Sequence, residues 1–461
     1  MLLYILGILI VVVGLALSIG LHEVGHLVPA KLFGVRVSQY MIGFGPTLFS
    51  RRRGETEYGV KLLPLGGYIS MAGMFPPKHR GEAPRDATTG FLDTFVSGPA
   101  EHDEPADAAP QERGLAAMAA EARAASAATI PEGEEHRTFY SLSTLKRVVI
   151  MFGGPFMNLV IAVVLYAVIL CGFGVSQPST VIGSVSECVV PATAEVQDCT
   201  DDAPEAPGAA GGVLPGDRLV SLDGEPIDSW NESTVIIQQN AGRTLDLVVD
   251  REGVEATLEV TPLETERYVT DEQGVVQEVD GEPQTQEVGF LGIGPAYETV
   301  RQPVTAVLPA VGDNIARVGH LILNLPQRMV DIAQAAFGTE ERDPNGPLSV
   351  VGVGRLAGEI TSLDTIPVLD RASSLIGLLA SLNVALFVFN LLPLLPLDGG
   401  HIAGAVFERV RRFFAKLFGR PDPGPLDTAK FIPLTFAVIV VFGAMSLLLI
   451  YADLVKPISI L

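Results

Sequence analysis

The chain has 461 residues, of which 48% are hydrophobic and 18% charged, and its mean hydropathy is +0.37. A soluble domain usually carries about a quarter charged residues, so this composition indicates a membrane protein rather than a large soluble core. The net charge of −22 argues against a nucleic-acid partner, and three cysteines are too few for a disulfide-dense scaffold or a zinc ribbon.

Four windows are apolar enough to cross a bilayer, which takes roughly 20 residues. They are residues 2–21, 148–173, 374–397 and 431–451. The first window has the alternative of a cleaved signal peptide, but it lacks a basic leading region and a small-residue cleavage site. We therefore predict a polytopic α-helical membrane protein with about four transmembrane helices.

Basic residues near the ends of these windows predict their orientation. They include Arg51, Arg52, Arg53, Lys61, Lys146 and Arg147 between the first and second windows, and Arg409, Arg411, Arg412, Lys416, Arg420 and Lys430 between the third and fourth. Both connections should be cytoplasmic, which places the region between the second and third windows on the outer side.

Residues 76–140 are rich in Ala, Pro, Glu and Asp and contain few large apolar side chains. Such a segment buries too little apolar surface to offset the entropy of an ordered chain. We predict a cytoplasmic acidic low-complexity insert, disordered or with one frayed helix. It is either a solvated insert or a regulatory one.

Residues 178–298 have the pattern of short strands separated by turns. The expected strands are 181–185, 217–224, 244–253, 254–260 and 289–294. Between residues 181 and 300 there are 25 acidic and 4 basic residues, which indicates a separate water-exposed domain. The run from Gly216 to Gly224 resembles the turn, strand and turn of a PDZ domain, so we expect a mixed α/β PDZ domain here.

Two polar, acidic inserts interrupt this domain, at residues 191–212 and 268–287. Cys188 and Cys199 flank the first insert, and they either close a small disulfide loop, if that side is oxidising, or remain two separate thiols. Cys171 lies in the second apolar window and is interpreted as a packing residue.

The first apolar window runs into His22-Glu23-Val24-Gly25-His26. On a helix, residues i and i+4 share a face, so two imidazoles can bind one zinc while the Glu between them reaches a zinc-held water. The alternative is a chance pattern or a pair of hydrogen-bonded surface histidines. An ionisable cluster continuing an uncharged membrane span is costly, which favours the metal site.

A catalytic zinc needs three protein ligands and one open position. Asp398 is the candidate for the third ligand, because it closes the third apolar window in a run from Asn390 to His401. His401, three residues further on, is the competing candidate. Cobalt or iron would suit these ligands nearly as well as zinc.

The chain resembles the site-2 protease family of intramembrane zinc metalloproteases, in the bacterial branch that has one PDZ domain. The matching segments are residues 22–26 (zinc motif), 43–46 and 64–68 (membrane-associated β-loop), 153–158 (second span), 346–347 and 390–400. Pro396 departs from the family pattern by one position, and the long inserts depart from compact members. With 24 Arg against 7 Lys, which indicates a GC-rich genome, the inserts suggest an actinobacterial member.

The resemblance implies a division of the chain into eight parts. They are 1–75, the first transmembrane helix with the zinc motif and the β-loop; 76–140, the insert; 141–177, the second transmembrane helix; 178–298, the extracytoplasmic PDZ domain; 299–370, a membrane-surface linker; 371–400, the third transmembrane helix with the Asp ligand; 401–430, a cytoplasmic basic loop; and 431–461, the fourth transmembrane helix.

The resemblance also implies roles for single residues. His22, His26 and Asp398 would hold Zn²⁺, and Glu23 would act as the general base. Asn390 would bind substrate, with the alternative that it satisfies a neighbouring backbone carbonyl. The remaining substrate-binding residues would be Gly66, Gly67 and Tyr68, in a segment (58–70) that either pairs with an extended substrate or forms an ordinary turn.

The function implied is cleavage of single-pass membrane proteins, such as anti-sigma factors, near the cytoplasmic side of the cell membrane after a first extracytoplasmic cut. The PDZ domain would either exclude uncut substrates by size or capture a new C-terminus. One alternative is a membrane-anchored PDZ scaffold with a structural metal site. A zinc transporter is a further alternative, but it would need ionisable groups along several spans.

Overall fold

The computed structural model describes residues 1–75, 85–88, 134–194, 199–200, 203–269, 276–279, 282–338, 342–343, 346–424, 426 and 431–458. The chain forms two compact units. The helical unit consists of Met1–Phe173 and Pro303–Leu461, and the sheet unit is Gly174–Gln302. The insert predicted at 76–140 lies mostly outside the described residues.

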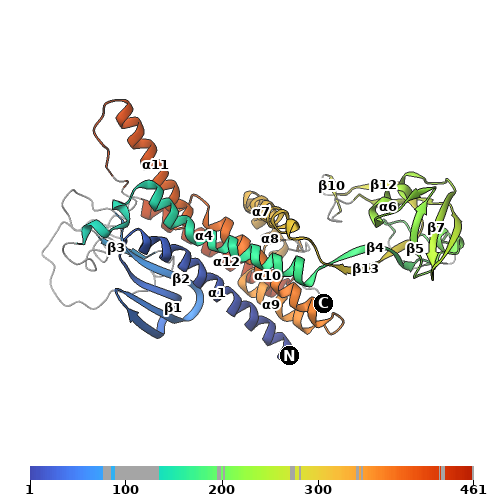
Figure 1. Cartoon of the computed structure of the whole chain (residues 1–461), viewed down its shortest axis with the longest axis horizontal. Helices are drawn as coiled ribbons and strands as arrows, with labels where there is room; N and C mark the ends of the chain where they lie inside the picture. The colour runs from blue at the N-terminus through green and yellow to red at the C-terminus, as the bar shows by residue number, and fades with distance from the viewer. Residues whose placement is uncertain are drawn as a thin grey trace. The chain divides into compact units, whose positions relative to one another are not determined.

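Among the described residues, four helices are long and apolar enough to cross a membrane. They are α1 (Leu2–Leu32), α4 (Thr144–Ala167, continued by the π-helical η3, Val168–Phe173), α10 (Val368–Asn390) and α12 (Ile432–Val455). Large apolar side chains remain exposed along their outer faces, as expected of helices in lipid. This arrangement fits a multi-pass membrane protein (Figure 1).

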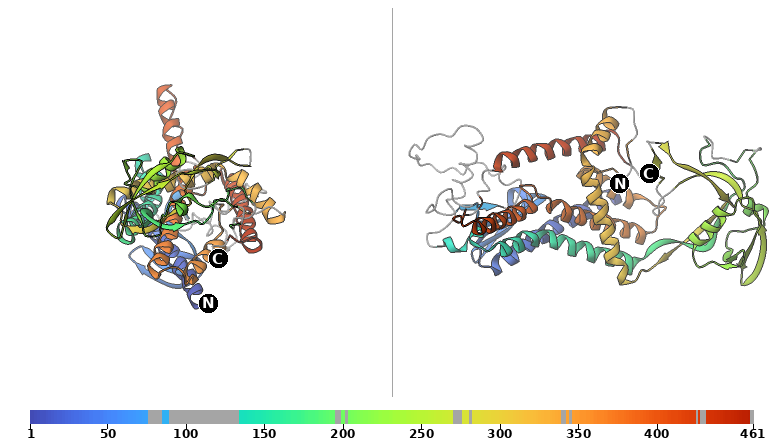
Figure 2. Two further views of the ribbon diagram at one scale, coloured as in Figure 1. Left: turned by 90° about the vertical axis from the view of Figure 1, so that its right-hand side faces the viewer. Right: turned by 90° about the horizontal axis from the view of Figure 1, so that it is seen from above.

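The first helix continues eleven residues beyond the predicted end of its span, to Leu32. Its second half lies against α4, and Figures 1 and 2 show the two helices side by side. A Cβ atom on Gly25 would lie 2.2 Å from the carbonyl oxygen of Gly153, so only glycine allows the helices to approach this closely. The motif His22–His26 therefore lies inside a packed helix rather than at its end.

A twisted hairpin covers this half of α1. Strands β1 (Val37–Arg53) and β2 (Thr56–Phe75) are antiparallel, and Gln39–Ile42 of β1 pairs both with Glu57–Val60 and with Gly67–Ser70 of β2. The short strand β3 (Arg85–Thr88) pairs with Ser70–Phe75. Residues 58–70 are thus part of a strand, and the interpretation of this segment as an ordinary turn is wrong.

The third transmembrane helix begins and ends earlier than predicted. Helix α10 ends at Asn390, and residues 391–397 form turns before α11 (Asp398–Leu417) begins. Proline cannot donate a backbone hydrogen bond and disfavours helix in the residue before it, and Pro393 and Pro396 fall in this break. Asp398 therefore opens a new helix instead of closing the third span. The predicted basic loop at 401–430 is helical as far as Leu417.

The predicted linker at 299–370 is also helical. It contains α7 (Val307–Leu323), α8 (Leu325–Phe337) and α9 (Val350–Ser362). Helix α9 packs on the start of α1, where Thr361 Oγ1 donates a hydrogen bond to the Leu3 carbonyl at 2.8 Å. Ala357 of α9 forms a buried apolar cluster with Val11 of α1 and Leu375 of α10, so α9 belongs to the core of this unit rather than to a loose linker.

The sheet unit contains a sheet with the strand order β13-β4-β5-β7-β8, in which β6 (Glu225–Pro226) pairs with β5, and a separate pair of β12 with β9. The ranges are β4 Val175–Val185, β5 Arg218–Leu222, β7 Leu245–Arg251, β8 Val254–Val260, β9 Leu263–Tyr268, β12 Thr285–Phe290 and β13 Ile293–Val300. The short strands β10 (Glu278–Val279) and β11 (Glu282–Pro283) pair with each other, and α5 (Pro207–Ala210) is a single turn. Helix α6 (Trp230–Gln239) starts with a Ser229–Glu232 capping box.

Most strands predicted for this unit are confirmed, with one exception. The segment 289–294 is divided between β12 and β13, because Gly292 adopts a positive φ of 73° between them. The turn, strand and turn predicted at 216–224 are present, with positive φ at Gly216, Asp223 and Gly224 around β5. The structure also joins Cys188 to Cys199 in a disulfide and leaves Cys171 free, which favours the first of the two alternatives.

Candidate metal centre and active site

Helix α1 presents His22, Glu23 and His26 toward the interior of the helical unit. Their exposed fractions are 9%, 5% and 1%, although they lie in a helix whose other half exposes apolar side chains. Burying three ionisable groups is costly unless they are paired or bind a metal. Their burial therefore calls for a partner in the surrounding elements.

The partner is Asp398 at the start of α11. His22 Nε2 lies 3.2 Å from His26 Nε2 and 3.3 Å from Asp398 Oδ2. His26 Nε2 lies 3.4 Å from the other carboxylate oxygen, Asp398 Oδ1. A tetrahedral zinc with bonds of about 2.1 Å separates neighbouring ligand atoms by about 3.4 Å. The spacing of these atoms thus fits a single zinc ion.

Among the residues that the structure describes, these three form the one group of at least three His, Cys, Asp or Glu side chains placed to hold a metal. His401, the competing candidate, is partly buried but does not belong to this group. The break between α10 and α11 decides this choice, because it turns the first residue of α11 toward α1.

A hydrogen bond that His26 donates to the backbone of α4 fixes the tautomer of its imidazole. Its Nδ1 lies 2.7 Å from the carbonyl oxygen of Ile150, which can only accept. Nδ1 therefore carries the proton, and the lone pair of Nε2 points to the centre of the cluster. This is the arrangement that a metal-binding imidazole requires.

His22 has its own orienting partner, Asn158 of α4. The Nδ2 atom of Asn158 lies 3.1 Å from His22 Nδ1, while Oδ1 is buried without a hydrogen bond. Amide oxygen and nitrogen atoms are assigned from hydrogen-bond networks. Rotating this amide by half a turn would let Oδ1 accept from His22 Nδ1–H and leave Nε2 for a metal, so the residues fit zinc in this orientation.

Asn158 is a contact that sequence reasoning missed, although it lies in the second-span segment 153–158. The signal available in the sequence was a lone amide in an otherwise apolar window, and the structure buries this amide completely. Gly154, in the same segment, has a steric role at the cluster. A Cβ atom on Gly154 would lie 2.2 Å from His26 Nε2 and 2.7 Å from His22 Nε2, so its role is to leave room for both imidazoles.

Glu23 lies beside the hairpin. A Cβ atom on Gly67 of β2 would lie 2.9 Å from Glu23 Cγ, so the strand backbone passes directly against this side chain. The hydroxyl of Tyr40, on β1, donates a hydrogen bond to the carbonyl oxygen of Gly20 on α1 at 2.8 Å. Burial, followed by the negative charge of Glu23, raises the pKa of Tyr40 to about 12.

The other predicted substrate-binding residues have different surroundings. Gly66 lies against the ring of Phe44, and Tyr68 is buried, with its hydroxyl donating to Gln39 Oε1 at 3.3 Å. Tyr68 therefore shapes the hairpin through its side chain. Asn390 is the last residue of α10 and partly buried, and the described residues offer its side chain no hydrogen bond.

Two buried imidazoles and a carboxylate around a zinc-sized space, with a glutamate next to them, define a metal-dependent peptidase. The comparisons identify the family: the model of peptidase family M50 matches residues 10–418. The chain therefore belongs to this family, the site-2 proteases, and is a zinc metalloprotease.

Curated relatives agree over nearly the full length. The chain is 33% identical over 469 residues to zinc metalloprotease Rip1 of Mycobacterium tuberculosis (strain H37Rv), covering 99% of both chains. It is 30% identical to Rip1 of Mycolicibacterium smegmatis, with coverage of 99% and 98%. Metalloprotease MmpA of Caulobacter vibrioides is 27% identical over 422 residues, 88% of each chain.

Proposed function

We propose that this protein hydrolyses peptide bonds of single-pass membrane proteins within the bilayer, with His22, His26 and Asp398 as zinc ligands. The observation that carries this proposal is the buried cluster of two imidazole nitrogens and the Asp398 carboxylate, with 3.2 to 3.4 Å between the atoms of different residues, in which both imidazoles belong to a helix apolar enough to cross a membrane. A soluble substrate would have no route to such a site, whereas a membrane segment would.

Zinc at this site would polarise the scissile carbonyl and lower the pKa of water. Glu23 accepts the proton of the attacking water and delivers it to the leaving amide nitrogen. Asn158 and the Ile150 carbonyl keep both imidazoles in the tautomer that leaves Nε2 unprotonated. The buried surroundings of the cluster exclude other water molecules.

The substrate would bind as an added strand on β2. Helical amides are already hydrogen-bonded, so the cleaved segment has to be extended before attack. Strand β1 occupies one edge of β2, and β3 occupies the other edge from Ser70 onward. The backbone of β2 at Gly67 passes next to Glu23, so a strand added to β2 at this point would lie beside the general base. Asn390 would donate a hydrogen bond to the substrate backbone.

We further propose that the sheet unit is a PDZ domain on the extracytoplasmic side and that the substrates are of the anti-sigma type, cut first outside the membrane. The turn–strand–turn at β5 and the acidic composition of this unit support the first point. The basic residues on both predicted cytoplasmic connections support the orientation. A structural metal site in a PDZ scaffold would instead need a fourth protein ligand, and the described group has three.

The test pairs the wild type with Glu23→Gln and Asp398→Asn, each purified in detergent, and uses a tagged single-span substrate already trimmed on its outer side. Glu23→Gln should keep zinc and lose cleavage, whereas Asp398→Asn should lose both. Asp370→Asn, in the first turn of α10 with its side chain exposed, is the matched control and should keep both. Cleavage by Glu23→Gln at the wild-type rate would refute the mechanism.

A further inference from the structure

The second half of α11 carries a strongly two-sided surface that the protease site does not use. The buried residues of α11 lie toward its start, and they are Asp398, Gly399, Gly400, Ala405 and Glu408. Apolar side chains repeat at helical spacing on the opposite side and are 45% to 68% exposed: Phe407, Val410, Phe413, Phe414, Leu417 and Phe418. Figures 1 and 2 show α11 projecting away from its neighbouring helices.

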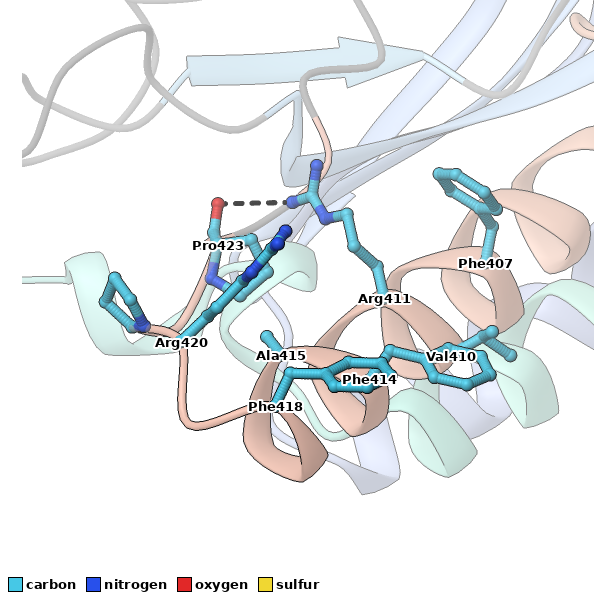
Figure 3. A pocket seen from close by; sticks show the side chains of 9 residues that line it. Phe407, Val410, Arg411, Phe414, Ala415, Phe418, Arg420 and Pro423 are labelled. Carbon is cyan, nitrogen blue, oxygen red and sulfur yellow. Dashed lines mark hydrogen bonds between the residues drawn. The ribbon is translucent and has the colours of Figure 1, made fainter.

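This apolar face borders a hollow of about 540 Å³ between α11 and the segment that follows it. Figure 3 shows Phe407, Val410, Phe414 and Phe418 along one side, with Arg411, Arg420 and Pro423 on the other. Arg411 donates to the carbonyls of Pro423 and Gly424, at 3.2 and 2.7 Å, and this holds the segment in place. An exposed aromatic face of this size on a helix normally marks a contact with another apolar phase.

The charges beside this face are predominantly positive, and the two acidic residues next to it, Glu408 and Asp422, both pair with Arg412. Between Arg409 and Arg420 there are five basic residues and no acidic one, in a chain whose net charge is −22. In the part of the chain that the structure describes, no ion pair is recorded for Arg409, Lys416 or Arg420, so these cations remain available to anions.

The position of α11 in the chain limits what can cover it. Seven residues, 391–397, separate it from the end of α10, and α12 follows from Ile432. Both neighbours are helices long and apolar enough to cross a membrane, so α11 remains tethered at a membrane face. Basic side chains flanking an aromatic apolar face are the pattern of a helix that lies in the headgroup region of an anionic leaflet.

We propose that the second half of α11, from Phe407 to Phe418, is an interfacial helix that inserts its aromatic face into the bilayer surface and binds anionic phospholipid headgroups through Arg409, Lys416 and Arg420. The occupant of this surface is the lipid of the leaflet, not a protein partner. This site is separate from the zinc ligands, although the same helix starts with Asp398.

The test uses tryptophan fluorescence in the full-length protein. The wild type has a single tryptophan, Trp230, in the sheet unit. The probe is Phe414→Trp in a Trp230→Phe background, reconstituted into phosphatidylcholine vesicles with or without phosphatidylglycerol. With phosphatidylglycerol, the emission should shift to shorter wavelength, and lipids brominated near the headgroup should quench it about twofold or more. Wild-type Trp230 is the control and should not respond to brominated lipid.

A second variant separates headgroup binding from simple insertion. Arg409→Gln/Lys416→Gln/Arg420→Gln, with the same probe, should reduce the response in phosphatidylglycerol vesicles to the level in phosphatidylcholine. Equal responses to both lipids in the unaltered probe protein would overturn the anionic preference. Quenching by aqueous acrylamide but not by brominated lipid would overturn insertion. Protection from both quenchers would mean that protein covers the face, which also overturns the proposal. Phe407→Trp repeats the measurement if Phe414→Trp does not fold.

Discussion

Arg147 of α4 holds Glu408 of α11 through two parallel hydrogen bonds, 2.8 Å from Nη2 to Oε1 and 3.0 Å from Nη1 to Oε2. Both side chains are buried, with exposed fractions of 7% and 2%. One partner belongs to the helix that supplies Asn158 and Gly154, and the other belongs to the helix that starts with Asp398. The pair therefore fixes the third candidate ligand relative to the helix that orients the two imidazoles.

Removing one member of this pair should destabilise the protein and weaken zinc binding together. Arg147→Met removes the bidentate partner of the buried Glu408 carboxylate, which keeps an ion pair with Arg412 at 3.0 Å. The cost should therefore lie below the value of about 3–5 kcal/mol expected for a buried charge left without any partner. The double variant Arg147→Met/Glu408→Met should recover most of that loss. The measurements are thermal unfolding in detergent and zinc affinity by chelator competition.

Arg328→Met is the matched control for this pair. Arg328 bonds the more exposed Asp343 at 2.8 Å, and such a pair contributes about 1 kcal/mol or less. If Arg147→Met bound zinc as tightly as this control, the proposed link between the pair and the site would be wrong.

Asn158→Ala should weaken zinc binding by about 10- to 100-fold, because His22 would lose the group that orients it. Asn158→Asp keeps an acceptor for His22 Nδ1–H and should retain more affinity than the alanine variant. Asn383→Ala is the control: Asn383 is also a fully buried amide, but its Nδ2 donates to Ser18 Oγ at 3.0 Å and does not contact the cluster. Equal zinc affinity in Asn158→Ala and Asn383→Ala would contradict the orienting role.

Gly154→Ala should abolish most zinc binding, since its new methyl group would occupy the space 2.2 Å from His26 Nε2. Gly172→Ala, at the far end of the same membrane-spanning helix, meets nothing within 4 Å and should bind zinc like the wild type. Metal content of both proteins after dialysis checks this prediction. A zinc-replete Gly154→Ala would show that the imidazoles can move aside.

The sheet unit should lose stability in acid through Asp217. Its hydrogen bonds with Arg251, at 2.8 and 2.7 Å, and then the backbone N–H of Leu214 lower the pKa of this buried carboxyl. The stabilisation is complete above the unfolded pKa of about 3.9 and is lost as the pH falls through the lower folded pKa. Urea unfolding followed by Trp230 fluorescence, at neutral pH and in steps below about pH 4, measures it.

Asp217→Asn should remove much of this acid sensitivity and lower the stability at neutral pH. Asp223→Asn is the comparison, because Asp223 pairs with the exposed Arg243 and such pairs stabilise by about 1 kcal/mol at most. An unchanged acid profile in Asp217→Asn would assign the acid sensitivity to other groups.

Local patterns in the sequence were sufficient for several features. The spacing of His22 and His26 follows from the repeat of the helix, and the strands around β5 and β7 follow from alternation and glycine turns. Apolar runs gave the four candidate membrane helices to within a few residues at most ends. These features depend on residues close together in the chain, where backbone geometry alone relates sequence to structure.

The tertiary structure alone decided the rest of the site. Asn158 meets His22 across 136 residues, and Arg147 meets Glu408 across 261. Pro393 and Pro396 indicate that the helix is interrupted, but only the packed structure shows that a new helix begins at Asp398. Contacts of this kind depend on how closely helices approach one another, which here is set by glycines at the α1–α4 crossing. The sequence by itself determined the family and the candidate ligands. The contacts that orient His22 and that join α4 to α11 required the packed fold, because they connect helices that are far apart along the chain.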